Sequence, residues 1–289
     1  MASTQLIKSR IRSVRNTRQI TKAMQLVAAS KMRKVQEAAG QTRYFSQTAR
    51  ELLTRLRQLV DIKQYALYST RPVQARLTIL ITSDRGLAGA YNSNVLKQYL
   101  NTLKADKASG VKNYTIAIGR KGSSIATRLE DVELVGAYHD FPMSPGANEL
   151  QPIVTAAVQM FTEQTVDAVD IIYTEFKSAV VQQAKTLKLL PAGFEETDVT
   201  EQIRLAVFEP SEEAVLENAT LRLLEAQLLQ ALLESFASEE SMRMLAMKNA
   251  TDNANELVDD LTLVFNNARQ AAITQELAEI TGGAEAMSE

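Results

Sequence analysis

Residues 250–271 read ATDNANELVDDLTLVFNNARQA, and the spacing of their apolar residues predicts the architecture of the chain. Small or apolar residues recur at alternating steps of four and three, at Ala250, Ala254, Leu257, Leu261, Val264, Ala268 and Ala271. Such a repeat forms the seam of a coiled coil, in which one helix packs against another. Because four of these seven residues are alanine, we expect the two helices to approach closely.

The helix predicted around this stretch is long. It starts at Pro210-Ser211-Glu212-Glu213, where a capping residue precedes acids at the positive end of the helix dipole. No glycine or proline follows until Gly282-Gly283, where we expect the helix to end. About 70 residues at a rise of 1.5 Å give a helix of roughly 105 Å.

A second long helix is predicted at the other end of the chain. From Ser3 to about Asp61 there is one glycine and no proline, and helix-forming residues dominate. At 1.5 Å per residue this helix is roughly 85 Å long. Its apolar stripe has spacings of three and four, at Ile7, Ile11, Val14, Ile20, Met24, Val27, Leu52, Leu56 and Leu59.

Charge is divided between these two helices. Residues 1–57 carry 13 lysines and arginines against two glutamates, a net charge of +11. Residues 211–289 carry four basic and 15 acidic residues, a net charge of −11, although the whole chain is only −2. Opposite charge at the two ends favours their association, so we expect the helices to pair antiparallel. The alternative is two separately solvated faces.

The middle of the chain alternates between strand and helix patterns. Strands are expected at 76–82, 114–118, 132–138, 168–176, 184–190 and 203–208, and helices at 92–103, 122–129 and 147–164. This succession predicts a small α/β domain with a mostly parallel sheet and one antiparallel edge. The predicted domains are a coiled-coil helix over 1–62, the α/β domain over 74–209, and a second coiled-coil helix over 210–285.

Composition excludes several kinds of site. The chain has no cysteine and one histidine, His139, which excludes disulfides, thiol nucleophiles and multi-histidine metal sites. No run of about 18 apolar residues occurs, so we expect no membrane-spanning helix. The first residues lack the apolar core of a signal peptide, and we expect the chain to stay where it is made.

Two turns, one histidine and a basic helix are the candidates for binding or chemistry. SDRGLAGA at 83–90 follows a predicted strand, where nucleotide-binding folds hold phosphate, but both common glycine signatures are absent. GRKG at 119–122 is either an anion site or a solvated turn, and His139 beside Asp140 is interpreted as a surface residue. The N-terminal helix carries nine cations before residue 35, as a nucleic-acid arm does, but no aromatic residue before Tyr44. We predict no catalytic residue, cofactor, metal or nucleic-acid partner.

Four segments, in order, resemble the γ subunits of F-type ATP synthases. They are ITKAMQLVAASKM at 20–32, SDRGLAGAYN at 83–92, MKNATDNA at 247–254 and ARQAAITQELAEITGGA at 268–284. The last fits the C-terminal signature of the family at every position, in which Ile-Thr-x-Glu is followed by aliphatic residues around a second glutamate. These matches extend across nearly the whole chain.

The resemblance implies a fold and a set of partners. The terminal helices would form an antiparallel coiled coil inside a ring of α and β subunits, above a central Rossmann-like α/β domain that touches the ε subunit and the c-ring. This non-catalytic shaft would couple proton-driven rotation of the c-ring to ATP synthesis or hydrolysis. Contacts with the catalytic β subunits are implied for Met24, Arg243, Arg269, Gln270, Thr274, Glu276 and Glu279.

The same resemblance suggests a location and excludes one mode of control. Since no targeting segment precedes the first helix, we expect a peripheral membrane protein at the cytoplasmic face of a bacterial plasma membrane, without direct insertion into the bilayer. The plant form of the family carries a redox-regulated cysteine insert in its central domain. This chain has no cysteine and no room for the insert near 190–205, so thiol control is not expected.

Overall fold

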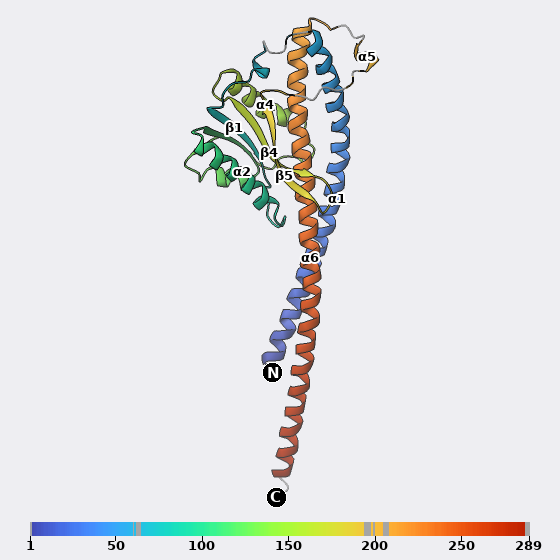
Figure 1. Cartoon of the computed structure of the whole chain (residues 1–289). Coiled ribbons are helices and arrows are strands. Elements are labelled where there is room, and N and C mark those ends of the chain that lie inside the picture. The colour runs from blue at the N-terminus through green and yellow to red at the C-terminus, as the bar shows by residue number, and fades with distance from the viewer. Residues whose placement is uncertain are drawn as a thin grey trace. The chain divides into compact units, whose positions relative to one another are not determined.

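Two long helices flank a five-stranded sheet in the chain order (Figure 1). The computed structural model describes residues 2–59, 61, 65–193, 198, 200–204 and 208–286. The long helices are α1, Ala2–Leu59, and α6, Glu212–Ala286. Between them lie η2 (Ala66–Tyr68), β1 (Ala75–Ile81), α2 (Tyr91–Ala108), β2 (Lys112–Ile118), α3 (Arg120–Ala126), β3 (Val132–Tyr138), α4 (Ala147–Thr162), β4 (Ala168–Phe176), β5 (Gln182–Leu190) and α5 (Glu201–Arg204).

The sheet has the strand order β3-β2-β1-β4-β5. The pairs β1–β2, β1–β4 and β2–β3 are parallel, and β4–β5 is antiparallel, which confirms the prediction of a mostly parallel sheet with one antiparallel edge. The strand predicted at 203–208 is wrong at Ile203 and Arg204, which lie in α5, and residues 205–207 are outside the described residues. A short apolar run cannot be assigned to strand or helix by its periodicity alone.

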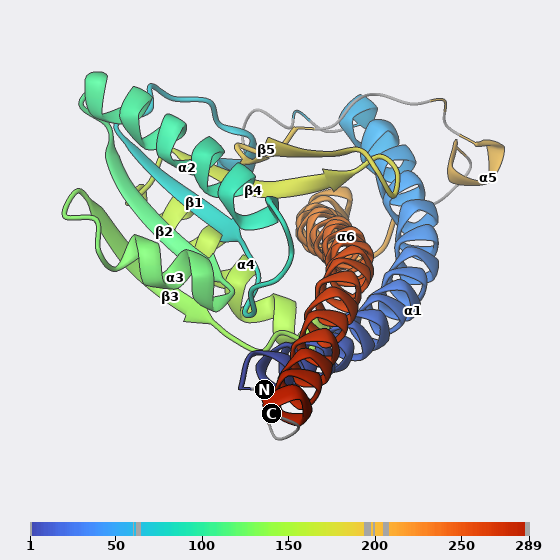
Figure 2. The ribbon, with the colours of Figure 1, turned by 90° about the horizontal axis from the view of Figure 1, so that it is seen from below.

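Different helices cover the two faces of the sheet. On one face, alternate residues of β1 form a buried cluster with α4 and α6, which includes Ile79, Ile153 and Leu228. On the other face, Leu80 packs with Tyr99 of α2. Figure 2 shows α2 and α4 on opposite sides of the sheet. The alternation of inward and outward side chains along β1 therefore serves two separate apolar layers.

A partly buried ion pair fixes the start of β4. The Asp167 carboxylate accepts the N–H groups of Gln74 at 2.8 Å and Ala75 at 3.0 Å, and the Arg71 guanidinium at 2.5 Å. Arg71 also donates to the Phe161 carbonyl at 2.9 Å and lies 4.6 Å from the centre of that ring. Burial disfavours the charged carboxylate, but these donors outweigh it and hold the pKa of Asp167 below its usual value.

Contacts divide the chain into a terminal unit, Met1–Ala28 with Arg243–Glu289, and a central unit, Ala29–Met242. Within the terminal unit, α1 and α6 lie side by side and antiparallel (Figure 1). The Thr21 and Thr251 hydroxyl oxygens are 2.8 Å apart, and Arg18 donates to the Asn255 side chain at 3.2 Å. As the residue number falls along α1, its partner's number rises along α6. The prediction that the terminal helices pair antiparallel is therefore confirmed.

The seam of α6 in the terminal unit differs from the predicted stripe. Its buried positions are Met247, Thr251, Ala254 and Val258. The predicted seam residues Leu257 and Val264 are 47% and 50% exposed, so the prediction is wrong at these positions. The prediction is correct at Ala254, which is buried, and at Leu261 and Ala268, which are half-buried. The polar Thr251 interrupts the true stripe in the sequence, whereas Ala250, Leu257 and Val264 beside it are all apolar.

The stripe predicted for α1 is correct at most of its positions and wrong at three. Ile11 and Leu56 are buried, and Ile7, Val14, Met24 and Leu52 are half-buried. The predicted positions Ile20, Val27 and Leu59 are instead 60%, 55% and 46% exposed. The buried residues are instead Thr21 and Ala28, which directly follow Ile20 and Val27. Counting from Val14 in alternating steps of four and three, as in a coiled-coil seam, leads to Thr21 and then to Ala28.

In the central unit, α1 and α6 pair antiparallel as well. Six residues form a buried apolar cluster between them, namely Ala49, Leu53, Leu56, Leu216, Ala219 and Leu223. Further along, Lys31 Nζ lies 3.9 Å from a carboxylate oxygen of Glu240. The oppositely charged ends of the chain therefore do meet, and apolar packing supplies much of the contact.

The helix α6 begins as predicted but does not end as predicted. Ser211 Oγ accepts the N–H of Ala214 at 3.3 Å, which caps the first turn. Gly282 and Gly283 were expected to end the helix, but it continues to Ala286. A glycine lowers helix stability by about 1 kcal/mol relative to alanine without excluding helical backbone angles, so this pair does not stop the helix.

Candidate functional site

The turn at 83–90 is closed by the protein's own groups. It follows β1, at the edge where α/β folds hold phosphate at a helix N-terminus. Here the Asp84 carboxylate accepts the N–H of Arg120 at 3.0 Å and the N–H of Asp140 at 2.9 Å. The Asp84 carboxylate thus ties the turn to the start of α3 and to the loop after β3. The turn itself carries neither common glycine signature of a phosphate site.

The second candidate turn, 119–122, is packed against the end of β1. Gly119 has a φ of 99°, and a Cβ placed there would lie 2.2 Å from the Thr82 carbonyl oxygen. Gly122 donates its N–H to Thr82 Oγ1 at 2.8 Å. The glycines therefore permit a close approach of backbone to strand. Since Arg120 also bonds the Asp140 carboxylate, the turn is held by internal contacts.

His139 and the described acidic residues give no sign of a metal centre. His139 is exposed and follows β3 directly, as expected for a surface residue. No group of three or more histidine, cysteine, aspartate or glutamate side chains could hold a metal ion within the described ranges. Among those same ranges, no helix is long and apolar enough to cross a bilayer.

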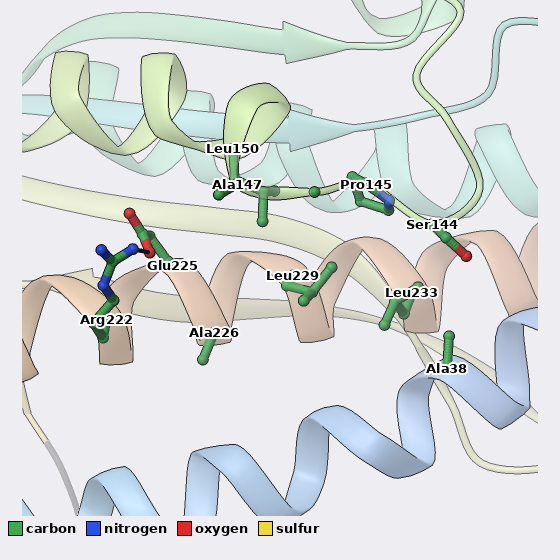
Figure 3. Close-up of a pocket in the computed structure, with 11 residues that line it drawn as sticks. Ala38, Ser144, Pro145, Ala147, Leu150, Arg222, Glu225, Ala226, Leu229 and Leu233 are labelled. Carbon is green, nitrogen blue, oxygen red and sulfur yellow. Dashed lines mark hydrogen bonds and ion pairs between the residues drawn. The ribbon is translucent and has the colours of Figure 1, made fainter.

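One cavity of the central unit, about 430 Å³, lies between α6, α1 and the start of α4 (Figure 3). Its lining is mainly apolar and includes Leu150, Leu229 and Leu233. The two charged side chains in the lining, Arg222 and Glu225, bond each other at 2.7 Å. Ligand sites orient their ligands with polar groups that converge on them. Because this charged pair is already satisfied, the cavity does not argue for a cofactor.

The residues predicted to contact β subunits form two groups along the terminal unit. Met24 and Arg243 are half-buried, so the methionine shares in the seam and keeps part of its surface open. Arg269 lies 26 residues beyond Arg243 on the same helix, which is about 39 Å. The structure does not bring these two groups together.

The second group is exposed on the last turns of α6. Arg269, Gln270, Thr274, Glu276 and Glu279 are all exposed. The Thr274 hydroxyl donates to the Gln270 carbonyl at 2.9 Å, and Glu279 accepts from the Gln275 amide at 2.9 Å. These bonds lie within one helix and can be exchanged for bonds to a partner. Contact with a β subunit stays a prediction for all seven residues.

The last turns of α6 have no partner from α1. Since Arg18 lies opposite Asn255 and the helices are antiparallel, Ala2, where α1 begins, lies opposite about Ala271. The red end of α6 extends past the blue start of α1 in Figure 1. From that point to Ala286, α6 is a single helix within the described part of the terminal unit.

The terminal unit also exposes many large apolar side chains. Those with 40% or more of their surface exposed are Leu6, Ile20, Leu26, Val27, Leu245, Leu257, Leu263, Val264, Ile273, Leu277 and Ile280. Single exposed apolar residues are normal, but a set this large on two helices indicates a surface that another protein covers. Sequence reasoning missed this surface because it assigned several of these residues to the seam.

Comparison with known proteins agrees with these features. Residues 3–287 match the family described as ATP synthase. The chain is 39% identical to the ATP synthase gamma chain of Stenotrophomonas maltophilia over 288 residues, which cover 99% of this chain and all of the relative. It is 41% identical to the gamma chain of Moorella thermoacetica over 289 residues, with the same coverage.

Solved structures give the same fold. The central stalk and c-ring structure of the Tetrahymena thermophila mitochondrial ATP synthase matches with a TM-score of 0.59 and 27% identity, over 80% of this chain and 99% of that one. The rotor of the Euglena gracilis enzyme matches in fold, with a TM-score of 0.63 and 20% identity, over 94% and 99% of the two chains. The chain therefore belongs to the ATP synthase gamma chain family, and it is a non-catalytic subunit of the rotor.

Proposed function

We propose that the terminal unit turns inside the catalytic ring of α and β subunits and couples rotation of the c-ring to ATP synthesis or hydrolysis. The observation that carries the proposal is the exposed apolar surface of the terminal unit, with Leu263 at 63% and Ile280 at 68% exposure. Apolar residues of the surrounding α and β subunits would remove this surface from water. Contacts of this kind are non-directional, so they allow a shaft to turn.

A shaft drives catalysis only if it interacts differently with each catalytic subunit. Moving a two-state site from 1:99 to 99:1 takes about 5.5 kcal/mol of bias. The terminal unit has a paired stretch and a single-helix end, and its two helices carry opposite charge. It therefore presents different faces in different directions. As the terminal unit turns, each β subunit would meet its different faces one after another. Each face would favour a different conformational state of that β subunit.

Six of the seven predicted contact residues are polar, and they would supply the hydrogen bonds and charges of this coupling. Arg269 and Gln270 are exposed at the end of the paired stretch, and Thr274, Glu276 and Glu279 are exposed beyond it, so all five would be accessible to β-subunit loops. A hydrogen bond contributes about 1 kcal/mol net, which suits contacts that form and break as the shaft turns. Met24 and Arg243 would act at a second level, since Arg243 is about 39 Å from Arg269 along α6.

The Met24→Lys substitution tests the second level. It would place a cation beside the acidic β-subunit loop that the family resemblance puts there, and so add an attraction that holds the rotor. We expect fewer protons pumped per ATP hydrolysed in the assembled complex. Gln19→Lys adds the same charge at an exposed position of α1 and serves as the control. Unchanged pumping in the Met24 variant would count against the placement.

For the remaining partners, we propose that the central α/β domain contacts the ε subunit and the c-ring. The division into residues 1–62, 74–209 and 210–285 belongs to the same proposal, as does a peripheral position at the cytoplasmic face of a bacterial plasma membrane. It follows that the coupled process is ion transport across that membrane. Support comes from the family membership and from the chain order, in which a long helix precedes the α/β domain and another follows it.

Co-purification from membranes tests the proposal as a whole. An affinity tag on the full chain should retain α, β, ε and c subunits, and detergent should be needed to release the c-ring. The tagged chain should not be retained on duplex DNA in a salt-dependent manner. If the tagged chain carries no α or β subunit, or is found on DNA instead, the proposal is wrong.

A further inference from the structure

The strand β4 is longer than its parallel neighbour β1. Pairing between β1 and β4 ends at Leu80 and Ile172, whereas β4 continues to Phe176. Beyond Ile172, the backbone groups of β4 that face away from β5 no longer have a strand to bond. Thr174 is such a residue, and it is only 2% exposed. A buried backbone group without a partner is costly, so something must replace the missing strand.

Two serines of α6 replace it. Thr174 donates its N–H to Ser235 Oγ at 3.1 Å, and its carbonyl accepts the Ser238 hydroxyl at 3.3 Å. Both serines have 0% exposure. The side chains of one helix thus complete the hydrogen bonding of a strand in the sheet. All of these residues belong to the central unit.

A third serine fixes the tip of the β4–β5 hairpin. The Ser241 hydroxyl donates to the Ala179 carbonyl at 2.7 Å and accepts the Gln182 amide at 3.3 Å. Ser241 is also 0% exposed. Since serines 235, 238 and 241 are three residues apart, they form a row along α6. The hairpin is held to the helix at both its middle and its tip.

The serine row contacts the sheet through hydrogen bonds, whereas the neighbouring residues of α6 contact it through apolar packing. The rest of this face of α6 packs on the sheet through apolar residues such as Leu228 and Leu232. Apolar contacts are non-directional and tolerate sliding, whereas hydrogen bonds weaken steeply when their angles change. Sliding of the sheet along α6, or rotation about it, would break all three serine contacts. The row therefore sets the position of the sheet on the helix.

We propose that Ser235, Ser238 and Ser241 form a hydroxyl clasp that passes turning force between the α/β sheet and α6. This inference rests on the proposed function, in which force enters at the c-ring and leaves at the catalytic ring. The domain and the helix must then not slip under load. The clasp supplies this resistance at the part of the sheet where β1 no longer reaches.

Hydrogen exchange of the full chain tests the clasp directly. In Ser235→Ala, the Thr174 amide loses its acceptor, and we expect it to exchange about fivefold faster, the factor that corresponds to about 1 kcal/mol. Ser241→Ala should speed exchange in the hairpin segment 177–182. Asn218→Ala is the matched control, because it removes a side-chain bond within α6, to the Ala214 carbonyl at 2.9 Å. Unchanged exchange in β4 and the hairpin would overturn the inference.

The assembled complex tests the mechanical role. The triple serine-to-alanine variant should hydrolyse ATP without load at the normal rate, but pump fewer protons per ATP against an established gradient. Normal pumping under load by an assembled triple variant would overturn the clasp and leave the rotor role intact. Failure of the unmodified chain to assemble with α and β would instead contradict the rotor role. If the triple variant does not fold, the single Ser241→Ala variant gives the same comparison.

Discussion

The hydroxyl pair Thr21–Thr251 offers the sharpest test of the paired helices. Thr21 Oγ1 also bonds the Arg18 carbonyl at 3.0 Å, and Thr251 Oγ1 bonds the Met247 carbonyl at 2.8 Å. Three bonds are therefore shared by two hydroxyl protons. At any moment one proton joins the two hydroxyls, and the other can bond the carbonyl of its own helix.

This arrangement fixes the expected energies. In Thr21→Val, the bond between helices is lost, but the Thr251 hydroxyl still donates to the Met247 carbonyl. No polar group is left unsatisfied, so the cost should be about 1 kcal/mol. Thr251→Val should cost the same, for the same reason. The double variant also loses the remaining bond from a threonine hydroxyl to a carbonyl of its own helix. Such a bond within a helix does not stabilise it, and methyl groups of similar shape replace both hydroxyls, so its loss adds no cost. The double variant should cost no more than either single variant, which gives an interaction energy of about 1 kcal/mol.

Hydrogen exchange in the terminal unit measures these energies. Unfolding of the whole chain is less suitable here, because the chain has two compact units and its unfolding would not report on the terminal unit alone. Protection of helical amides near both positions should fall about fivefold in each single variant and no further in the double. The control is Thr262→Val, whose hydroxyl bonds the Val258 carbonyl of its own helix at 2.7 Å. If the two single effects add in the double variant, the hydroxyls do not interact and the reasoning is refuted.

Three further predictions follow from the same structure. Asp167→Asn should make the free energy of unfolding fall less steeply as the pH is lowered. Folding lowers the pKa of Asp167, so its carboxylate stabilises the protein above the unfolded pKa of about 3.9, and this stabilisation is lost as the pH falls through the folded pKa. Urea unfolding between pH 2 and 7 measures this, and an unchanged slope would count against it. Gly119→Ala should lower the urea midpoint strongly, because its Cβ would meet the Thr82 carbonyl, whereas Gly86→Ala, with open space around it, should not. Thr274→Val should reduce torque in the assembled complex while circular dichroism of the chain stays unchanged, since this side chain is exposed, and loss of helix would contradict it.

Much of the fold could be predicted because it depends on local patterns. The β-branched run before Ser83 and the buried run at Ala168–Phe176 identify strands without knowledge of their neighbours. The helix start at Ser211 follows from capping chemistry. These features depend on residues close together in the chain, so one sequence contains the information that specifies them.

The serine row could not be predicted, because its cause lies elsewhere in the chain. Ser235 and Ser238 are buried for a reason set by β1, which ends before β4 does. No local pattern in α6 reports where a strand 150 residues earlier stops. In the same way, Thr251 gave no signal as a seam residue, since its partner Thr21 is 230 residues away. Buried polar residues that serve distant backbone are found only once the fold is known.

The errors in the predicted seam show where the protein meets its surroundings. The predicted stripe shares Ala254 with the true seam, but it continues through Leu257 and Val264, which are exposed, whereas the true seam continues through Val258. A helix that packed on one neighbour alone would be polar there. The helix α6 thus has a seam toward α1 and a second set of apolar residues that is exposed. Beyond Ala271 no described residue of α1 lies opposite α6, and an isolated helix of about 15 residues is only marginally stable in water. We therefore expect the end of α6 to be stabilised by the proposed partner and not by α1.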